Sequence, residues 1–249
     1  MILEYEGTRY AGFQRQVDQP TIQSKVEESI KLLTGSTSIV SGAGRTDSGV
    51  HATGQVVAFN LLKAFSLKKL QSGLNAYLPD DIAVRAVYET PLNFDPRRHA
   101  VSRVYRYTIQ LGKIRSPLRS RFVYEIKAPV NTGDMSKALS LIEGNHDFAP
   151  FSGRIDPEKS TRRSIFRTLV HCEQSEVHIE IEGNAFLPQQ IRRTVGALIE
   201  IGSGKKNYSY LKELVDHGGK GDASWVIPAK GLCLVAVKYQ GFPPDDYAD

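Results

Sequence analysis

The residues best suited to carry out a reaction lie in a glycine-rich stretch, SGAGRTDSGVHATGQ, that runs from Ser41 to Gln55. Arg45, Thr46 and Asp47 stand in a row between glycines, whereas a plain connection between strands would need the glycines alone. Glycine allows backbone conformations that push one side chain outward, and loops between strands commonly carry catalytic groups. Because the cation of Arg45 favours the ionised form of Asp47, this carboxylate is suited to act as a nucleophile or a general base.

Other functions for this stretch are excluded by its spacing. Gly42 and Gly44 match the start of a dinucleotide-binding fingerprint, but Asp47 stands where the third glycine belongs, and a strand follows instead of a helix. The chain has no G-K-[ST] sequence, which removes a phosphate-binding P-loop. His51 has no second ligand at helical spacing. We therefore expect no metal and no cofactor.

The distribution of charge points to a polyanionic partner. The net charge is +5, and eight Lys or Arg residues but no Asp or Glu lie between Arg97 and Arg121. Tyr105 and Tyr107 stand inside that run. Two further basic clusters lie at residues 159–167 and at Arg192–Arg193. Basic clusters interleaved with aromatic residues suit a nucleic acid whose bases can stack, and we prefer this to a merely solvated surface.

Composition indicates a cytoplasmic globular protein. No apolar run approaches the roughly 20 residues that span a bilayer, and the first residues lack the pattern of a secretory signal. Cys172 and Cys233 are far apart and lack a metal-binding spacing. We expect both to be reduced, as is usual in the cytosol.

Hydrophobic periodicity predicts two similar α+β halves, residues 1–100 and 101–249. We expect them to share a mostly antiparallel mixed sheet, with helices packed mainly on one face. The elements that define this pattern are a helix capped by Thr21 and stopped by Gly35, a helix capped by Ser66, a hairpin of strands 104–111 and 121–126, tandem strands at 164–174 and 176–184, a helix that begins with Pro188, and a last strand at 231–240.

The stretch GAGRTDSGVHATGQVVAF resembles the signature of the TruA-type tRNA pseudouridine synthases, in which G-R-T-D holds a catalytic aspartate. Further segments resemble the same family in the same order, from about Ile2 to Tyr239. These segments are LEYEGTRYAGFQRQ, LNAYLPDDIAV, FDPRRHAVSRVYRY, EGNHDFAPFS, NAFLPQQIRRTVGALIEIG and PAKGLCLVAVKY. Six ordered matches are far more specific than one short motif.

The resemblance implies a pseudouridine synthase fold with an active-site cleft between its halves, and it implies roles for four residues. Asp47 matches the nucleophile, Tyr105 the tyrosine that packs on the target base, Arg192 the basic partner of the aspartate, and Arg45 the arginine that holds the flipped nucleotide. The chain departs from some relatives at PQ, residues 188–189, where they carry histidines, which puts substrate details in doubt. The basic run adds two expected RNA contacts, Arg97 and Arg103.

The resemblance also implies the substrate and the assembly. Members of the family act on uridines 38, 39 and 40 in the anticodon arm of tRNA, need no cofactor and form homodimers. The sequence leaves open whether Asp47 attacks C6 of the base or C1′ of the ribose. It also leaves two alternatives: an RNA-binding protein or tRNA folding helper without chemistry, and a related synthase that acts on another RNA.

Overall fold

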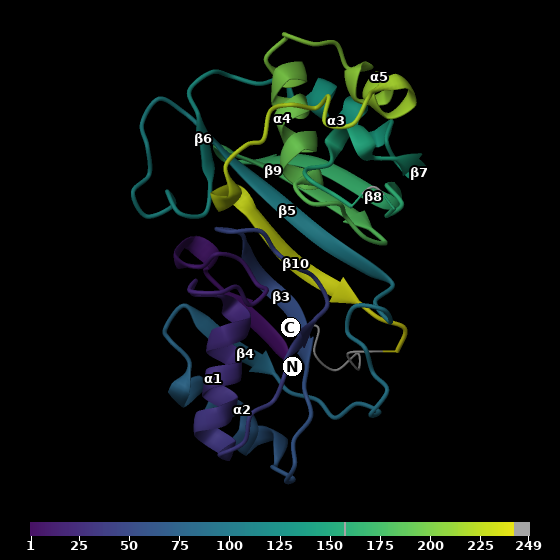
Figure 1. The fold of residues 1–249 in the computed structure, drawn as a ribbon. Helices are drawn as coiled ribbons and strands as arrows, with labels where there is room; N and C mark the ends of the chain where they lie inside the picture. The colour runs from purple at the N-terminus through teal and green to yellow at the C-terminus, as the bar shows by residue number, and fades with distance from the viewer. Residues whose placement is uncertain (157, 242–249) are drawn as a thin grey trace. The chain divides into compact units, whose positions relative to one another are not determined.

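The computed structural model describes residues 1–156 and 158–241, and the chain divides into two compact units (Figure 1). Unit 1 combines Met1–Val101 with the chain from Cys233 onward, and unit 2 is Ser102–Leu232. The first crossing between units lies one residue from the boundary expected at residue 100. The last strand, however, belongs to unit 1. The expected two halves stay a prediction, and each unit is described by itself below.

Unit 1 is built on a sheet in the order β4-β1-β3-β10. Its strands are β1 (Ile2–Tyr5), β3 (His51–Ala58), β4 (Ile82–Ala86) and β10 (Leu232–Lys238). β1 runs antiparallel to both β3 and β4, whereas β10 runs parallel to β3. A two-residue strand, β2 (Ser41–Gly42), pairs with the far end of β3 and leads into the glycine-rich loop.

Two helices, α1 (Ile22–Thr34) and α2 (Leu67–Tyr77), lie on one face of this sheet (Figure 1). α1 buries Ile22, Val26 and Ile30. The Thr21 side chain accepts a hydrogen bond from Ser24 N–H, and the Ser24 side chain accepts one from Thr21 N–H in return. Gly35 ends the helix at a φ of 73°, in the left-handed region that favours glycine. Both expected caps, Thr21 and Ser66, are confirmed.

Unit 2 is built on an antiparallel sheet in the order β5-β9-β8-β7. The strands are β5 (Ser102–Leu111), β7 (Gly144–Asp147), β8 (Arg162–Glu173) and β9 (Glu176–Gly183). β9 alternates strictly, with its odd-numbered residues buried, whereas β5 buries Ser102 and Thr108 in addition to its odd-numbered residues from 103 to 109. β6 (Tyr124–Ile126) pairs with the end of β5 in parallel, so the expected hairpin is wrong. The connection, residues 112–123, is long enough to bring the chain back before it pairs.

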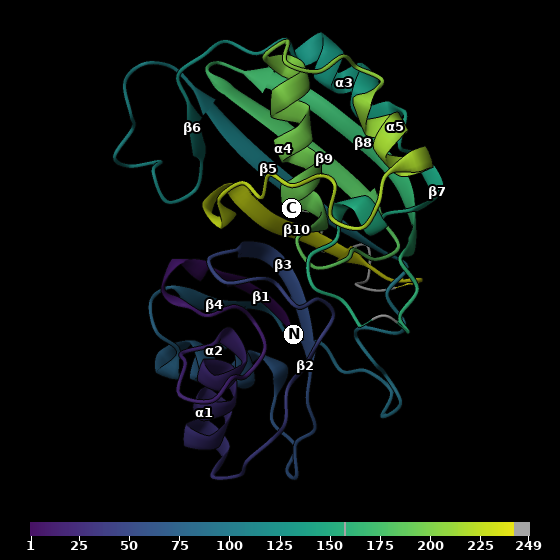
Figure 2. The ribbon, with the colours of Figure 1, turned by 45° about the horizontal axis from the view of Figure 1, so that its top comes forward.

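The helices α3 (Thr132–Ser140), α4 (Gln190–Gly202) and α5 (Tyr210–His217) cover one face of the unit 2 sheet (Figure 2). α4 is buried along most of its length, because α3, α5 and the chain after α5 all pack around it. It begins at Gln190 rather than at Pro188, since Gln189 adopts a left-handed conformation with a φ of 62°. Three short 3-10 turns lie at Gly7–Arg9, Ala149–Phe151 and Ala229–Gly231.

The α+β class is therefore confirmed, with mostly antiparallel pairing and helices on one face in each unit. In the part of the chain that the structure describes, no helix combines the length and the apolar character that crossing a bilayer requires.

The reciprocal cap of α1 predicts a measurable loss of stability. Thr21 is fully buried, so we expect Thr21→Ala to lower the free energy of unfolding by about 1–2 kcal/mol. Ser66→Ala is the matched control. Ser66 caps α2 through a longer bond of 3.4 Å to Lys69 N–H at an exposed position, so it should cost less than about 0.5 kcal/mol. Urea unfolding followed by circular dichroism measures both values, and equal losses would contradict the role of the reciprocal cap.

Candidate active site

The glycine-rich loop joins β2 to β3 in unit 1 and is tied to the backbone of neighbouring segments. Ala43 N–H donates to Val56 O at 2.9 Å, where the loop leaves β2. Further along, Phe13 N–H donates to Thr46 O at 3.1 Å, and Gly49 N–H donates to Tyr10 O at 3.3 Å. The segment 10–13 therefore holds the centre of the loop on one side.

Two glycines, Gly7 and Gly12, allow the N-terminal segment to pack closely against the backbone of the loop. A Cβ on Gly12 would lie 2.7 Å from Thr46 O, and Gly12 has a φ of +107°. A Cβ on Gly7 would lie 2.0 Å from Val50 O, at the end of the loop. Gly7 N–H also donates to Nδ1 of the buried His51 at 3.1 Å. His51 therefore has a structural role in unit 1.

A buried polar cluster holds the loop from beneath. Gln55 on β3 is fully buried, and its side-chain amide bonds both to Gly44 N–H, at 3.2 Å, and to Gly44 O, at 2.9 Å. The hydroxyl of Tyr5 on β1 lies 2.9 Å from Thr46 Oγ1 and 3.4 Å from Gln55 Nε2. Burial raises the pKa of Tyr5, so its phenol stays neutral and able to donate.

These anchors decide which side chains of the loop face outward. Thr46 is 6% exposed and points into unit 1. Its neighbours differ: Arg45 is exposed and Asp47 is half-buried. The loop therefore carries a guanidinium and a carboxylate on either side of one buried residue, and an oriented carboxylate is a group that can act as a nucleophile.

Tyr105 lies in unit 2, on β5. It is 9% exposed, and its ring lies perpendicular to that of Phe186, at a centroid distance of 5.3 Å and an interplanar angle of 88°. Tyr107 is on the same side of the strand and is fully buried, and its hydroxyl donates to Pro228 O at 2.7 Å. Tyr107 therefore belongs to the core of unit 2.

Arg192 lies on α4 and is half-buried rather than a freely solvated surface residue. Its Nε donates to Ile227 O at 2.8 Å. The chain around Ile227 runs close along α4, because a Cβ on Gly196 would lie 2.4 Å from Trp225 O. The Arg192 charge also acts to lower the pKa of Tyr107, against the larger upward effect of burial. The guanidinium is therefore oriented by Ile227 O and lies close enough to Tyr107 to influence its pKa.

The other expected RNA contacts differ in their surroundings. Arg103 is 7% exposed and donates to Asn184 O at 2.7 Å, whereas Arg97 is exposed. Two other arginines of the basic run are paired with carboxylates. Arg106 forms an ion pair with Glu180 at 2.7 Å, and Arg119 forms one with Glu176 at 2.9 Å. Part of the basic run is thus neutralised by the sheet itself, and Arg97 and Arg45 stay accessible.

The structure assigns the expected site residues to two sets. Asp47 and Arg45 share one loop in unit 1, whereas Tyr105, Arg192 and Arg103 belong to unit 2. Sequence reasoning missed the anchors Tyr5 and Gln55. A signal for Gln55 was present: a polar residue stands at a core-facing position in the apolar strand that follows the loop.

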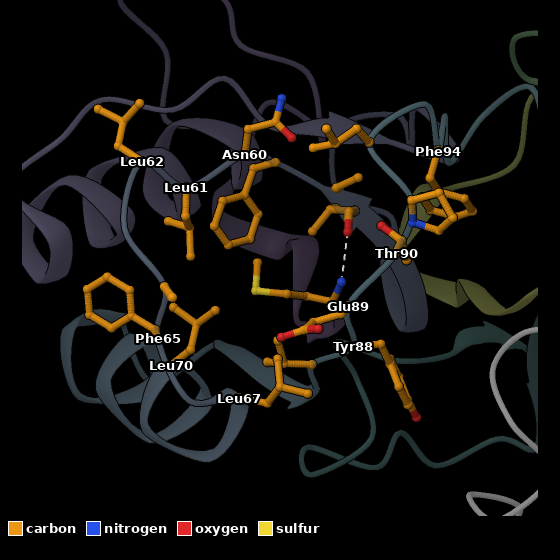
Figure 3. A pocket seen from close by; sticks show the side chains of 18 of the residues that line it. Asn60, Leu61, Leu62, Phe65, Leu67, Leu70, Tyr88, Glu89, Thr90 and Phe94 are labelled. Atoms are coloured by element: carbon orange, nitrogen blue, oxygen red, sulfur yellow. Dashed lines mark hydrogen bonds between the residues drawn. The ribbon is translucent and has the colours of Figure 1, made fainter.

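A cavity of about 450 Å³ lies elsewhere in unit 1 (Figure 3). Apolar side chains such as Leu61, Phe65 and Leu70 line it together with polar ones such as Glu89, and Asp47 does not line it. It surrounds Met1, at the opposite end of β1 from Tyr5. Among the residues that the structure describes, no three His, Cys, Asp or Glu side chains are grouped to hold a metal ion.

Comparison with known proteins identifies the family. The family model described as tRNA pseudouridine synthase matches residues 1–97 and 138–240. The protein named tRNA pseudouridine synthase A from Citrifermentans bemidjiense is 39% identical over 241 residues, with 96% of each chain covered. Its namesake from Geotalea uraniireducens is 39% identical over 239 residues, covering 96% of this chain and 98% of that protein. The namesake from Myxococcus xanthus is 38% identical over 245 residues, covering 98% and 92%.

Together with the α+β units, these matches define an RNA-modifying enzyme of the isomerase class. The chain belongs to the tRNA pseudouridine synthase family.

The approach of Gly12 to the loop predicts a position-specific sensitivity. Gly12→Ala should lower the free energy of unfolding by about 3 kcal/mol, because its strained φ is joined by a collision with the Thr46 carbonyl. Gly35→Ala is the matched control. Its φ is +73° but nothing lies within 4 Å of the added methyl, so only the backbone strain of about 1–2 kcal/mol should appear. Thermal and urea unfolding compare the two, and an equal loss would show that segment 10–13 does not pack on the loop as described.

Proposed function

We propose that this protein isomerises uridine to pseudouridine at positions 38, 39 and 40 in the anticodon arm of tRNA, with Asp47 as the nucleophile. One observation carries the proposal: Asp47 is a half-buried carboxylate beside an anchored residue, inside the segment that the family model matches. The relatives named tRNA pseudouridine synthase A support the substrate class.

The reaction is an isomerisation that balances without an outside reagent. The bond between N1 and C1′ breaks, the base turns, and a bond between C5 and C1′ forms. The C5 proton leaves and N1 gains one, so nothing is oxidised or reduced. A carboxylate can start this sequence by attack on C6 of the base or on C1′ of the ribose, and either route gives a covalent intermediate. Asp47 needs only to be ionised and correctly aimed.

Tyr105 and Arg192 would complete the site. A guanidinium can hold a carboxylate through two parallel N–H bonds, which fix both distance and plane. The Nε bond of Arg192 to Ile227 O supports this role, because it orients the guanidinium before substrate arrives. Tyr105 would stack on the target base, and its contact with the perpendicular ring of Phe186 would hold it in place.

Binding of the anticodon arm requires that the target uridine leave its stack. Base flipping costs a few kcal/mol, and stacking on an aromatic ring recovers about 1–3 kcal/mol. Arg45 would hold the flipped nucleotide, and the exposed Arg97 would contribute on the phosphate side, whereas Arg103 is buried and bonded to Asn184 O. Phosphate contacts position RNA without reading its sequence, which suits an enzyme that acts on three neighbouring uridines. We further propose that the protein works in the cytoplasm as a homodimer.

Replacing the proposed nucleophile separates chemistry from binding. Asp47→Asn keeps the shape of the side chain and removes its charge, so we expect no detectable pseudouridine, while the tRNA dissociation constant changes by less than about threefold. Asp80→Asn removes an exposed carboxylate of unit 1 and should retain parental activity. Unmodified tRNA is incubated with each variant and pseudouridine is mapped by position. Product at the parental rate from Asp47→Asn would refute the nucleophile, and product outside positions 38–40 would refute the target.

The proposed pairing of Arg192 predicts that lysine cannot replace it. Arg192→Lys keeps the charge but loses the two-point geometry, so the single-turnover rate should fall by roughly 10- to 100-fold with little loss of stability. Arg193→Lys is the neighbouring control. Arg193 donates to Ala223 O and Gln189 Oε1 within unit 2, so this variant should lose about 1–3 kcal/mol of stability yet keep its rate when folded. Equal rates for parent and Arg192→Lys would remove Arg192 from the site.

A further inference from the structure

The side chain of Gln55 takes the place of a strand partner for Gly44. Gln55 is fully buried on β3, and its amide pairs with both backbone groups of one loop residue, at 3.2 Å and 2.9 Å. Gly44 lies directly before Arg45, where the loop has left the short pairing of β2 with β3. The glycine-rich backbone would otherwise have many accessible conformations at this point.

The hydrogen bonds that Gln55 makes in this cluster have a defined direction. Gly44 N–H can only donate and Gly44 O can only accept, so Oε1 and Nε2 of Gln55 are assigned without ambiguity. The second proton of Nε2 points to the Tyr5 hydroxyl oxygen at 3.4 Å. That hydroxyl lies 2.9 Å from Thr46 Oγ1, and either of these two oxygens can donate to the other. A single buried chain of hydrogen bonds thus runs from Gln55 through Tyr5 to Thr46.

We propose that Gln55 and Tyr5 are positioning residues for the reaction, which hold the loop so that Asp47 keeps one direction. The inference rests on the proposed role of Asp47. Gln55 fixes residue 44 and Tyr5 fixes residue 46, so the two outward side chains, Arg45 and Asp47, each adjoin an anchored position. Neither Gln55 nor Tyr5 needs to touch the substrate, because both are buried within unit 1.

Loss of these anchors should lower the rate of the reaction rather than the affinity for tRNA. A misplacement of about 1 Å at a reacting group can lower a rate by roughly 100-fold. Among the proposed tRNA contacts Arg45 lies on the loop, whereas Arg97 and Tyr105 come from other parts of the chain and are unchanged when the loop is loosened, so most of the proposed binding contacts remain. A purely structural role would instead lower stability and leave the rate of the folded enzyme as it is.

Unit 1 contains a second amide clamp that provides a matched control. Asn75 on α2 accepts from Val84 N–H at 2.7 Å and donates to Val84 O at 3.0 Å. The chemistry equals that of Gln55 with Gly44, but the clamped residue lies on β4 instead of on the loop. Asn75→Leu therefore removes the same pair of bonds without touching residues 44–47.

The experiment compares Gln55→Met, Tyr5→Phe and Asn75→Leu. Each is tested with unmodified tRNA under single-turnover conditions at saturating enzyme, together with tRNA binding and thermal unfolding. We expect the rate to fall roughly 10- to 100-fold for Gln55→Met and about 3- to 10-fold for Tyr5→Phe. The dissociation constant should change by less than about threefold in both. Asn75→Leu should keep the parental rate.

The double variant tests whether the two residues act as one chain. Groups in one hydrogen-bond network are not additive, so Gln55→Met with Tyr5→Phe should be little slower than Gln55→Met alone. Tyr5→Phe keeps the ring and loses one oxygen, so it supplies a folded variant if Gln55→Met does not fold.

Parental rates for Tyr5→Phe, or an equal fall in rate for Asn75→Leu, would overturn the inference. Asp47→Asn, measured in the same assay, distinguishes this failure from failure of the proposed function. Inactive Asp47→Asn with unaffected Tyr5→Phe overturns only the positioning role. An active Asp47→Asn overturns the proposed nucleophile, and the positioning role falls with it.

Discussion

The site depends on how a glycine-rich backbone is held in one conformation. Thr46 is the residue at which the loop is held. Its carbonyl accepts a hydrogen bond from Phe13 N–H, and its hydroxyl is hydrogen-bonded to the hydroxyl of Tyr5. Glycines permit the shape of the loop but do not favour it, since each added glycine increases the conformational freedom that folding must remove. Backbone contacts on one side and a buried polar chain on the other remove that freedom. The carboxylate of Asp47 is then carried by the residue next to this anchored position.

Neutral backbone groups also orient functional side chains in unit 2. Backbone carbonyls at Ile227 and Pro228 accept from Arg192 and Tyr107, so two side chains of separate elements are oriented by one short segment. In both units a charged group is aimed by contacts that do not themselves carry charge. Neutral anchors suit a reaction centre because they orient a group without competing for the partner that it must meet in the reaction. The proposed chemistry then requires that the loop of unit 1 and the guanidinium of unit 2 serve one uridine.

Patterns in the sequence predicted the features that depend on residues close together in the chain, such as helix ends and the faces of strands. Thr21 and Gly35 mark the ends of α1, and alternation places Tyr105 and Tyr107 on one side of β5, because capping and strand periodicity depend on neighbours in sequence. Parallel pairing of β6 and the place of β10 beside β3 are decided by contacts across many residues, and the sequence pattern did not show them. Gln55 illustrates the same limit at the site, since its partners, Gly44 and Tyr5, are 11 and 50 residues away.

An experimental structure of the protein bound to tRNA tests the central claim most directly. The account predicts a uridine turned out of its stem, with the Asp47 carboxylate facing C6 or C1′ and within about 4 Å of the Arg192 guanidinium. Gln55 should still bond to both backbone groups of Gly44 in that complex. A different carboxylate facing the extruded base, with Asp47 turned away from it, would contradict the account.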